Sequence, residues 1–102
     1  MKLLTLISHA SAQQDLSDML RTLKQVPGFT FTHVEGHGVQ VESDVFLSER
    51  DKVVGYTPRV RVDILLEDTA VGEVLDMIRK VENSVIGHSV YWVSQVDQGG
   101  HL

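Results

Sequence analysis

The sequence contains no cysteine, which excludes disulfide bonds and thiolate metal sites. Basic residues are also scarce, since nine Lys and Arg are scattered among fourteen Asp and Glu and leave a net charge of −5. A nucleic-acid partner requires a clustered basic surface that neutralises phosphates, so we expect no nucleic-acid binding. No apolar run reaches the roughly 18 residues of a membrane-spanning helix, and the short run after Met1 lacks a signal-peptide pattern. We therefore expect a cytoplasmic protein without direct membrane insertion.

The remaining composition is typical of one globular domain. A chain of 102 residues corresponds to a single domain, here residues 1–102. Because a domain of this size buries a smaller share of its surface than a larger one does, a modest core or oligomerisation has to supply its stability.

Apolar periodicity predicts four strands and two helices. The first helix begins at Ser11, which fits a capping box with Gln14, and it ends before Pro27. The second helix follows a cap at Asp68 or Thr69. The strands are predicted over residues 2–7, 29–35, 58–67 and 88–96.

The order of these elements predicts an α+β fold, a ferredoxin-like βαββαβ sandwich. It has a four-stranded, mainly antiparallel sheet with two helices on one face. The polar segment at about 39–57 joins the two halves, and a connection of that length is usually functional or disordered.

The third strand separates its side chains by face, with Val60, Val62, Ile64 and Leu66 on one side and Arg59, Arg61, Asp63 and Glu67 on the other. We interpret the charged set as cross-strand pairs or inter-subunit contacts rather than as a phosphate clamp. The first and last strands have apolar residues on both faces, and we expect Tyr91 and Trp92 in the core and an interface. The second sheet face is therefore predicted to pack against copies of the chain, unless residues 39–57 fold back over it.

With this order in view, the sequence resembles the nitrogen-regulatory PII proteins. Residues 27–38, which read PGFTFTHVEGHG, are similar to the PII second strand, and residues 58–64, which read PRVRVDI, are similar to the start of the third. A closer resemblance is to a short PII-like family of unknown function, encoded beside heavy-metal efflux systems in bacteria. That family also has a Gly-x-Gly exit, here Gly36 and Gly38, and a Tyr-Trp-Val last strand, here residues 91–93.

The resemblance implies a non-enzymatic signalling protein that forms a homotrimer and binds a small ligand between subunits. An adenine nucleotide is the ligand that PII proteins suggest, although Val90 replaces the lysine of the PII phosphate-binding stretch. Residues 39–57 correspond to the PII loop that contacts a target protein, here a membrane transport or efflux component. The residues that match the PII ligand cleft are Gly28, Phe29, Thr30, Gly36, His37, Gly38, Gly87, His88 and Ser89.

A divalent transition metal is the alternative ligand, bound in a metal-tolerance protein of similar fold. His33, Glu35 and His37 alternate along the second strand, so imidazole and carboxylate groups suited to zinc, copper or nickel can share one face. The ordinary interpretation of the same residues is a strand histidine and a turn histidine. No spacing in the sequence supports a catalytic triad, paired carboxylates or a Walker loop, so we expect no enzymatic activity.

Overall fold

The computed structural model describes residues 1–37, 57–82 and 89–102. Nearly all of the predicted 39–57 segment lies outside the described residues, as do Gly38, Gly87 and His88. The elements follow the order β1 (Lys2–His9), η1 (Ala10–Ala12), α1 (Gln13–Leu20), β2 (Thr30–Gly36), β3 (Thr57–Leu66), η2 (Asp68–Ala70), α4 (Val71–Glu82) and β4 (Val90–Gln95).

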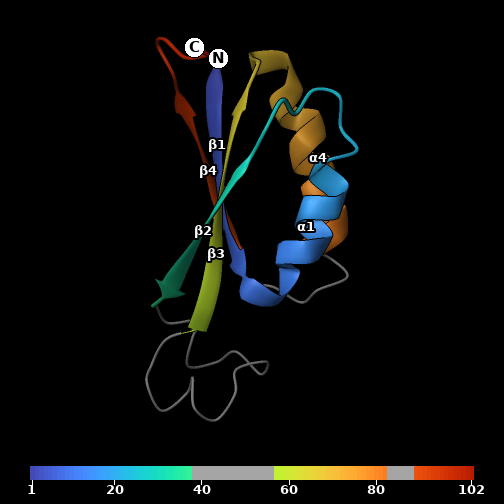
Figure 1. The fold of residues 1–102 in the computed structure, drawn as a ribbon, viewed down its shortest axis with the longest axis vertical. Coiled ribbons are helices and arrows are strands. Elements are labelled where there is room, and N and C mark those ends of the chain that lie inside the picture. The colour runs from blue at the N-terminus through green and yellow to red at the C-terminus, as the bar shows by residue number, and fades with distance from the viewer. Residues whose placement is uncertain (38–56, 83–88) are drawn as a thin grey trace.

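The four strands form one sheet in the order β2-β3-β1-β4, and every neighbouring pair is antiparallel. Figure 1 shows both helices on the same side of this sheet. The predicted ferredoxin-like α+β sandwich is therefore confirmed. Its central strands are β1 and β3, while β2 and β4 form the two edges.

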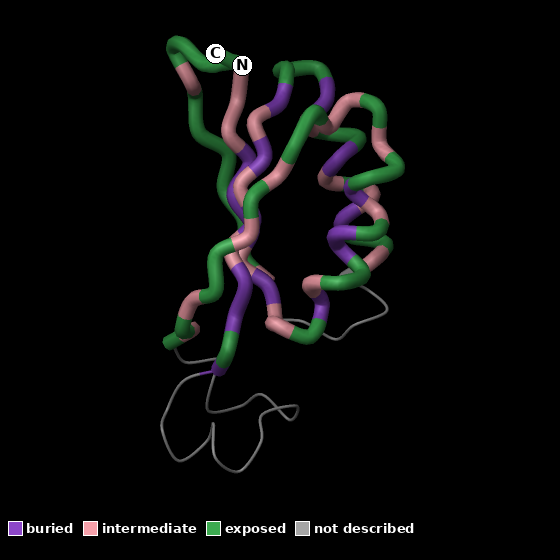
Figure 2. The backbone as a smooth tube through the Cα atoms, in the orientation of Figure 1, coloured by how far each residue is buried: buried purple, intermediate pink, exposed green. Residues whose placement is uncertain are grey.

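The strand register decides which side chains face the helices. Leu4 pairs with Ile64 and Leu6 with Val62, and all four are buried beneath α1 and α4. Figure 2 shows the buried positions concentrated along the central strands and the inner sides of the helices. The helices complete this core with Ala12, Leu16, Leu20, Ala70, Val74 and Ile78. Alternation in the third strand thus placed the core residues correctly.

The starts of both helices differ from the prediction. The Ser11 N–H donates to His9 Nδ1 over 3.2 Å, so His9 caps η1, and Gln14 donates to Asp18 instead of forming a capping box. The predicted capping box was wrong because a 3-10 turn precedes α1. The second helical segment is preceded by Glu67, whose side chain makes no capping hydrogen bond, rather than by a capping Asp68 or Thr69.

The first helix also ends earlier than predicted. Its last residue is Leu20, and the Thr22 hydroxyl donates to the Met19 carbonyl over 2.6 Å in the turn that follows. The same carbonyl also accepts from the Thr22 backbone N–H over 3.0 Å, a bond three residues apart that replaces a further α-helical turn. The Lys24–Phe29 connection is therefore not helical, and it runs toward the start of β2.

The sheet face away from the helices, which we call the open face, is covered by no described helix or strand (Figure 1), although the C-terminal tail lies against it at Leu65. It carries Leu3, Thr5 and Ile7 of β1 and Arg59, Arg61, Asp63 and Leu65 of β3. On the edges the register adds Thr30, Thr32 and Val34 of β2 and Val90, Trp92 and Ser94 of β4. Within the described ranges, no helix is long and apolar enough to cross a membrane.

Candidate functional site

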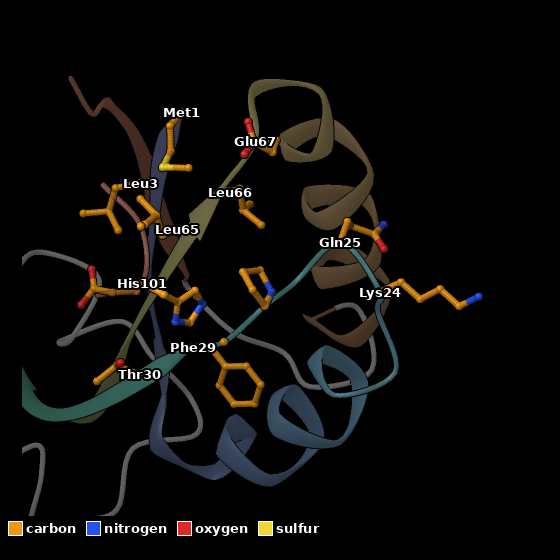
Figure 3. Close-up of a pocket in the computed structure, with 14 residues that line it drawn as sticks. Met1, Leu3, Lys24, Gln25, Phe29, Thr30, Leu65, Leu66, Glu67 and His101 are labelled. Carbon is orange, nitrogen blue, oxygen red and sulfur yellow. The ribbon is translucent and has the colours of Figure 1, made fainter. Parts of the chain in front are cut away.

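A cavity of about 760 Å³ lies where the Lys24–Phe29 connection passes the ends of β1 and β3. We call it the Phe29 cavity. Its walls come from segments far apart in sequence, including Leu3, Leu65 and the C-terminal His101 (Figure 3). Three predicted ligand residues, Gly28, Phe29 and Thr30, line it together. Its apolar walls and few polar groups suit a small organic ligand.

Asp63 forms the polar wall of this cavity and is held by two neighbours. The Thr5 hydroxyl donates to Asp63 Oδ1 over 2.8 Å, and Arg61 donates to both carboxylate oxygens over 3.0 and 3.2 Å. Partial burial raises the pKa of Asp63, but the hydrogen bonds from Arg61 and Thr5 and the charge of Arg61 lower that pKa by more. The Arg61 guanidinium also lies 5.7 Å from the centre of the Trp92 ring. Asp63 is therefore an ionised, fixed acceptor.

Gly36 lies at the other end of β2, where the Arg59 side chain leaves no room for a larger residue. A methyl group at Gly36 would lie 2.7 Å from Arg59 Cγ and 3.1 Å from its Nε. Arg59 is only 5% exposed, so its side chain has little room to move. In the described residues only Gly100 has a positive φ, so Gly36 is required for close approach rather than for a turn.

The three candidate metal ligands, His33, Glu35 and His37, lie near one another along the chain, but their side chains contact different partners. His33 Nε2 lies 2.9 Å from Gln13 Oε1, and His37 Nε2 lies 3.4 Å from Glu35 Oε2. In the part of the chain that the structure describes, no three His, Asp or Glu side chains gather as a metal-binding group. The structure brings together two of the three, and the metal site stays a prediction.

The predicted ligand-cleft residues fall into three places within one chain. Thr30 and Gly36 lie at opposite ends of β2, about 20 Å apart at the usual rise of a strand. Ser89 precedes β4, on the opposite edge of the sheet, where its hydroxyl donates to Ser8 Oγ over 3.1 Å. A single chain therefore separates residues 28–30, 36–37 and 89.

Several cavity residues were not predicted from the sequence as ligand residues. Asp63 was assigned to an ion pair, and its place beside Thr30 follows from the register between β2 and β3. Lys24, Glu67 and His101 also line the cavity, although no motif marks them. Alternation along the strand predicts the sheet face on which Asp63 lies. Only the register between β2 and β3 shows that Thr30 is its neighbour.

Comparison with known proteins places this architecture in a family. A family model described as "Protein of unknown function (DUF3240)" matches residues 1–102. The chain belongs to the DUF3240 family. A solved DUF3240 family protein from Shewanella baltica OS155 has the same fold, with a TM-score of 0.78 at 21% identity over 99% of this chain and 94% of that one.

The DUF3240 chain is also similar to a nitrogen regulatory protein. GlnK of Escherichia coli K12 is 26% identical over 99 residues, which cover 96% of this chain and 88% of GlnK. GlnK of Shigella flexneri matches with the same identity and coverage. The resemblance to the PII-like proteins is therefore confirmed at the level of family and fold.

Proposed function

We propose that this DUF3240 protein is a non-enzymatic, PII-like regulator that acts in the cytoplasm as a homotrimer. It binds a small ligand between subunits, with an adenine nucleotide as the first candidate, and contacts a target protein through residues 39–57. The observation that carries this proposal is the Phe29 cavity, because it gathers Gly28, Phe29 and Thr30 into one ligand-sized space. The similarity to GlnK supports the regulatory class.

The cavity suits a flat, amphipathic ligand. Leu3, Phe29 and Leu65 offer apolar contacts, while Asp63 and Glu67 offer carboxylate acceptors. Carboxylates accept hydrogen bonds from amino groups, which the adenine ring has, so the residues present fit the base of an adenine nucleotide. The phosphate groups need donors from elsewhere, because Asp63 and Glu67 repel them.

The homotrimer is supported by the composition of the β4 edge. Val90, Tyr91, Trp92 and Val93 are all exposed, although each is a large apolar side chain. They alternate between the two faces of an edge strand, so no single helix of the same chain can cover them. Contiguous exposed apolar surface of this kind is typical of an interface.

Assembly would also unite the separated ligand residues. The Gly36 end of β2 and the Ser89 end of β4 lie on opposite edges of one chain, so contact between them requires edges from two chains. A ligand that spans such a junction can change residues 39–57, since these begin just after His37. Regulation then requires that the ligand bind one arrangement of that segment more tightly. We propose a membrane transport or efflux component as the target.

Metal binding is the second candidate function and rests on the Glu35–His37 pair. The 3.4 Å contact supplies one carboxylate and one imidazole, which suit a divalent transition metal. Further ligands would have to come from His33, after release from Gln13, or from another subunit.

A thermal-shift experiment separates the two candidates. ATP, ADP, AMP, Zn²⁺, Cu²⁺ and Ni²⁺ are each added to the assembled protein, because a ligand at 100 times its Kd stabilises the native state by about 2.7 kcal/mol. We expect ATP or ADP to raise the melting temperature of the wild type but not of Thr30→Trp, which fills the Phe29 cavity. Thr69→Trp, at an exposed site on η2, is the control.

A rise with Zn²⁺, Cu²⁺ or Ni²⁺ that His37→Ala abolishes would instead support the metal candidate. If neither nucleotides nor metals change the melting temperature, both ligand proposals are wrong. An effect of ATP that Thr30→Trp leaves unchanged would place nucleotide binding outside the Phe29 cavity.

A further inference from the structure

A second hollow lies on the helix-covered side of β2, between this strand and α1. It has a volume of about 470 Å³ and we call it the α1–β2 groove. Figure 3 shows the Phe29 ring pointing toward α1, on the side of the strand away from the open face. The groove is lined by Ala10, Ser11, Gln13, Gln14, Ser17, Arg21, Phe29 and Phe31.

One wall of the groove is a polar stripe on α1. Gln13, Ser17 and Arg21 recur at intervals of four residues, so they lie above one another on the same side of the helix. The other wall consists of two aromatic rings. Phe29 and Phe31 meet edge to face, with their centres 5.6 Å apart and an angle of 81° between the rings. The groove thus pairs a hydrogen-bonding wall with an aromatic one.

Ser17 adds a hydroxyl to the polar wall. The residue as a whole is only 8% exposed, but its hydroxyl is accessible from the groove, since Thr57 Oγ1 is the side-chain atom of the described residues that is buried without a partner. A hydroxyl can donate one hydrogen bond and accept others. The open side of Ser17 is the groove itself, so a group bound there can accept from this hydroxyl.

The neighbours of Ser17 present donors. Gln13 Oε1 lies 2.9 Å from His33 Nε2, and with that oxygen accepting from the ring, the amide N–H groups of Gln13 remain available. The Arg21 guanidinium has no ion-pair or hydrogen-bond partner in the described ranges. By contrast, Ser11 is engaged with His9 over 2.9 Å and Gln14 with Asp18 over 2.8 Å.

Three available donor groups beside an aromatic wall define the complementary ligand. A carboxylate accepts several hydrogen bonds, and both of its oxygens can pair with one guanidinium group. A flat apolar body attached to it can pack against the two rings. Asp18, which neighbours the groove through Gln14, and the net charge of −5 both oppose a second negative charge.

We propose that the α1–β2 groove is a binding site for an organic monoanion, a carboxylate on a flat apolar body. Its carboxylate accepts from Arg21, Ser17 and Gln13, and its apolar body packs on Phe29 and Phe31. This site lies on the helix side of β2 and shares Phe29 with the Phe29 cavity, but the proposal does not rest on ligand binding between subunits. It would let the protein respond to a second, chemically distinct ligand.

The test uses 4-fluorobenzoate as the probe in a fluorine NMR titration of the assembled full-length protein. A ligand of this size binds weakly, so we expect a Kd of about 1 mM. The free and bound probe should then exchange rapidly on the NMR timescale. Neutral 4-fluorobenzamide, which has the same shape without the charge, should bind at least about tenfold more weakly because it cannot pair with a guanidinium.

Two variants test the residues of the groove. Arg21→Gln removes the cation and Ser17→Ala removes the hydroxyl that faces the groove, and each should weaken 4-fluorobenzoate binding about tenfold, the effect of one lost charged hydrogen bond. Ser17→Ala is expected to fold at least as stably as the wild type, since alanine has a higher helix propensity than serine. Melting curves of both variants check their folding.

Lys24→Gln is the matched control. It removes the same charge three residues after Arg21, but Lys24 lines the Phe29 cavity and not the groove. Binding that Lys24→Gln leaves unchanged and Arg21→Gln weakens supports the proposal. Absence of binding at about 10 mM probe, equal binding of the amide, or equal weakening by Lys24→Gln would overturn it. None of these outcomes bears on the response to nucleotides or metals.

Discussion

Gly36 illustrates how a single residue can be fixed by a neighbour rather than by its own backbone. A Cβ at this position would lie 2.7 Å from Arg59 Cγ, an atom near the start of a 95% buried side chain. We predict that Gly36→Ala destabilises the protein by about 1–3 kcal/mol, the usual cost of overpacking a buried position. Urea denaturation measures the change in the free energy of unfolding.

The control for this prediction is Gly28→Ala. A Cβ at Gly28 meets no atom within 4 Å, so this substitution should change stability by less than about 1 kcal/mol. Equal losses for the two variants would mean that Arg59 does not set the requirement for glycine at position 36.

Asp63 has a pH dependence that follows from its partners. Its pKa is lower in the folded protein, because the contacts with Arg61 and Thr5 outweigh partial burial. The ionised carboxylate therefore stabilises the fold at pH values above about 3.9, the ordinary pKa of aspartate, and this contribution is lost as the pH falls through the folded-state pKa. We predict that Asp63→Asn is less stable than the wild type at neutral pH.

The difference between wild type and Asp63→Asn should shrink as the pH falls below about 5, because protonation of Asp63 removes the charge that asparagine lacks. Asp68, whose pKa is also lowered, titrates in the same range but is present in both proteins. Urea denaturation at a series of pH values measures the difference. A constant gap between the two proteins would contradict a role for the Asp63 charge.

At the scale of elements, the alternation of apolar residues correctly predicted which strand face is buried, whereas the predicted capping box at Ser11 was wrong. Val62, Ile64 and Leu66 are buried as predicted, because an alternating strand in a two-layer fold must turn one face to the helices. Ser11 fitted a capping box, but His9 provides an imidazole acceptor two residues earlier and stabilises a 3-10 turn first. Competing caps differ by small energies that a pattern does not resolve.

The last strand was predicted correctly as a strand but not as a core element. Tyr91 and Trp92 are 46% and 42% exposed, so within one chain they are not core residues. We attribute their apolar character to the proposed contacts with other subunits. This is the basis of a prediction for β4 as a whole.

We predict that Val90→Lys dissociates the homotrimer. Val90 is 53% exposed, so a lysine there costs little within one chain but places a charge in the proposed interface. Sedimentation velocity should show a species of three 11.4 kDa chains for the wild type and smaller species for the variant. Thr69→Lys, at an exposed polar site on η2, should remain assembled.

A wild type that sediments as a single chain would contradict the trimer. If Val90→Lys assembles like the wild type, Val90 does not lie in the subunit interface.

At the scale of the whole molecule, the candidate site could be predicted from the sequence only in fragments. The motif of residues 28–30 does line a cavity, but Asp63 and His101 reach it through register and tail placement, which depend on the complete fold. The motifs also gave no sign that Thr30, Gly36 and Ser89 lie far apart in one chain. Whether they act together is a property of the assembly.

Mixed trimers test this property directly. Thr30→Trp blocks the Phe29 cavity, and Ser89→Trp blocks the start of β4 on the opposite edge. We predict that neither variant binds ATP alone, because each subunit junction needs both edges. When equal amounts are unfolded and refolded together, random assembly gives about a quarter of the junctions two intact edges, so about a quarter of the wild-type ATP capacity should return.

Refolded wild type sets the full capacity in an equilibrium binding measurement with labelled ATP, and each variant refolded alone sets the background. Recovery in the mixture requires that residues from two chains build one site, since no single chain in it carries both intact edges. A mixture that stays at background would contradict a site shared between two chains, whereas ATP binding by Ser89→Trp alone would confine ligand recognition to the Phe29 cavity of each subunit.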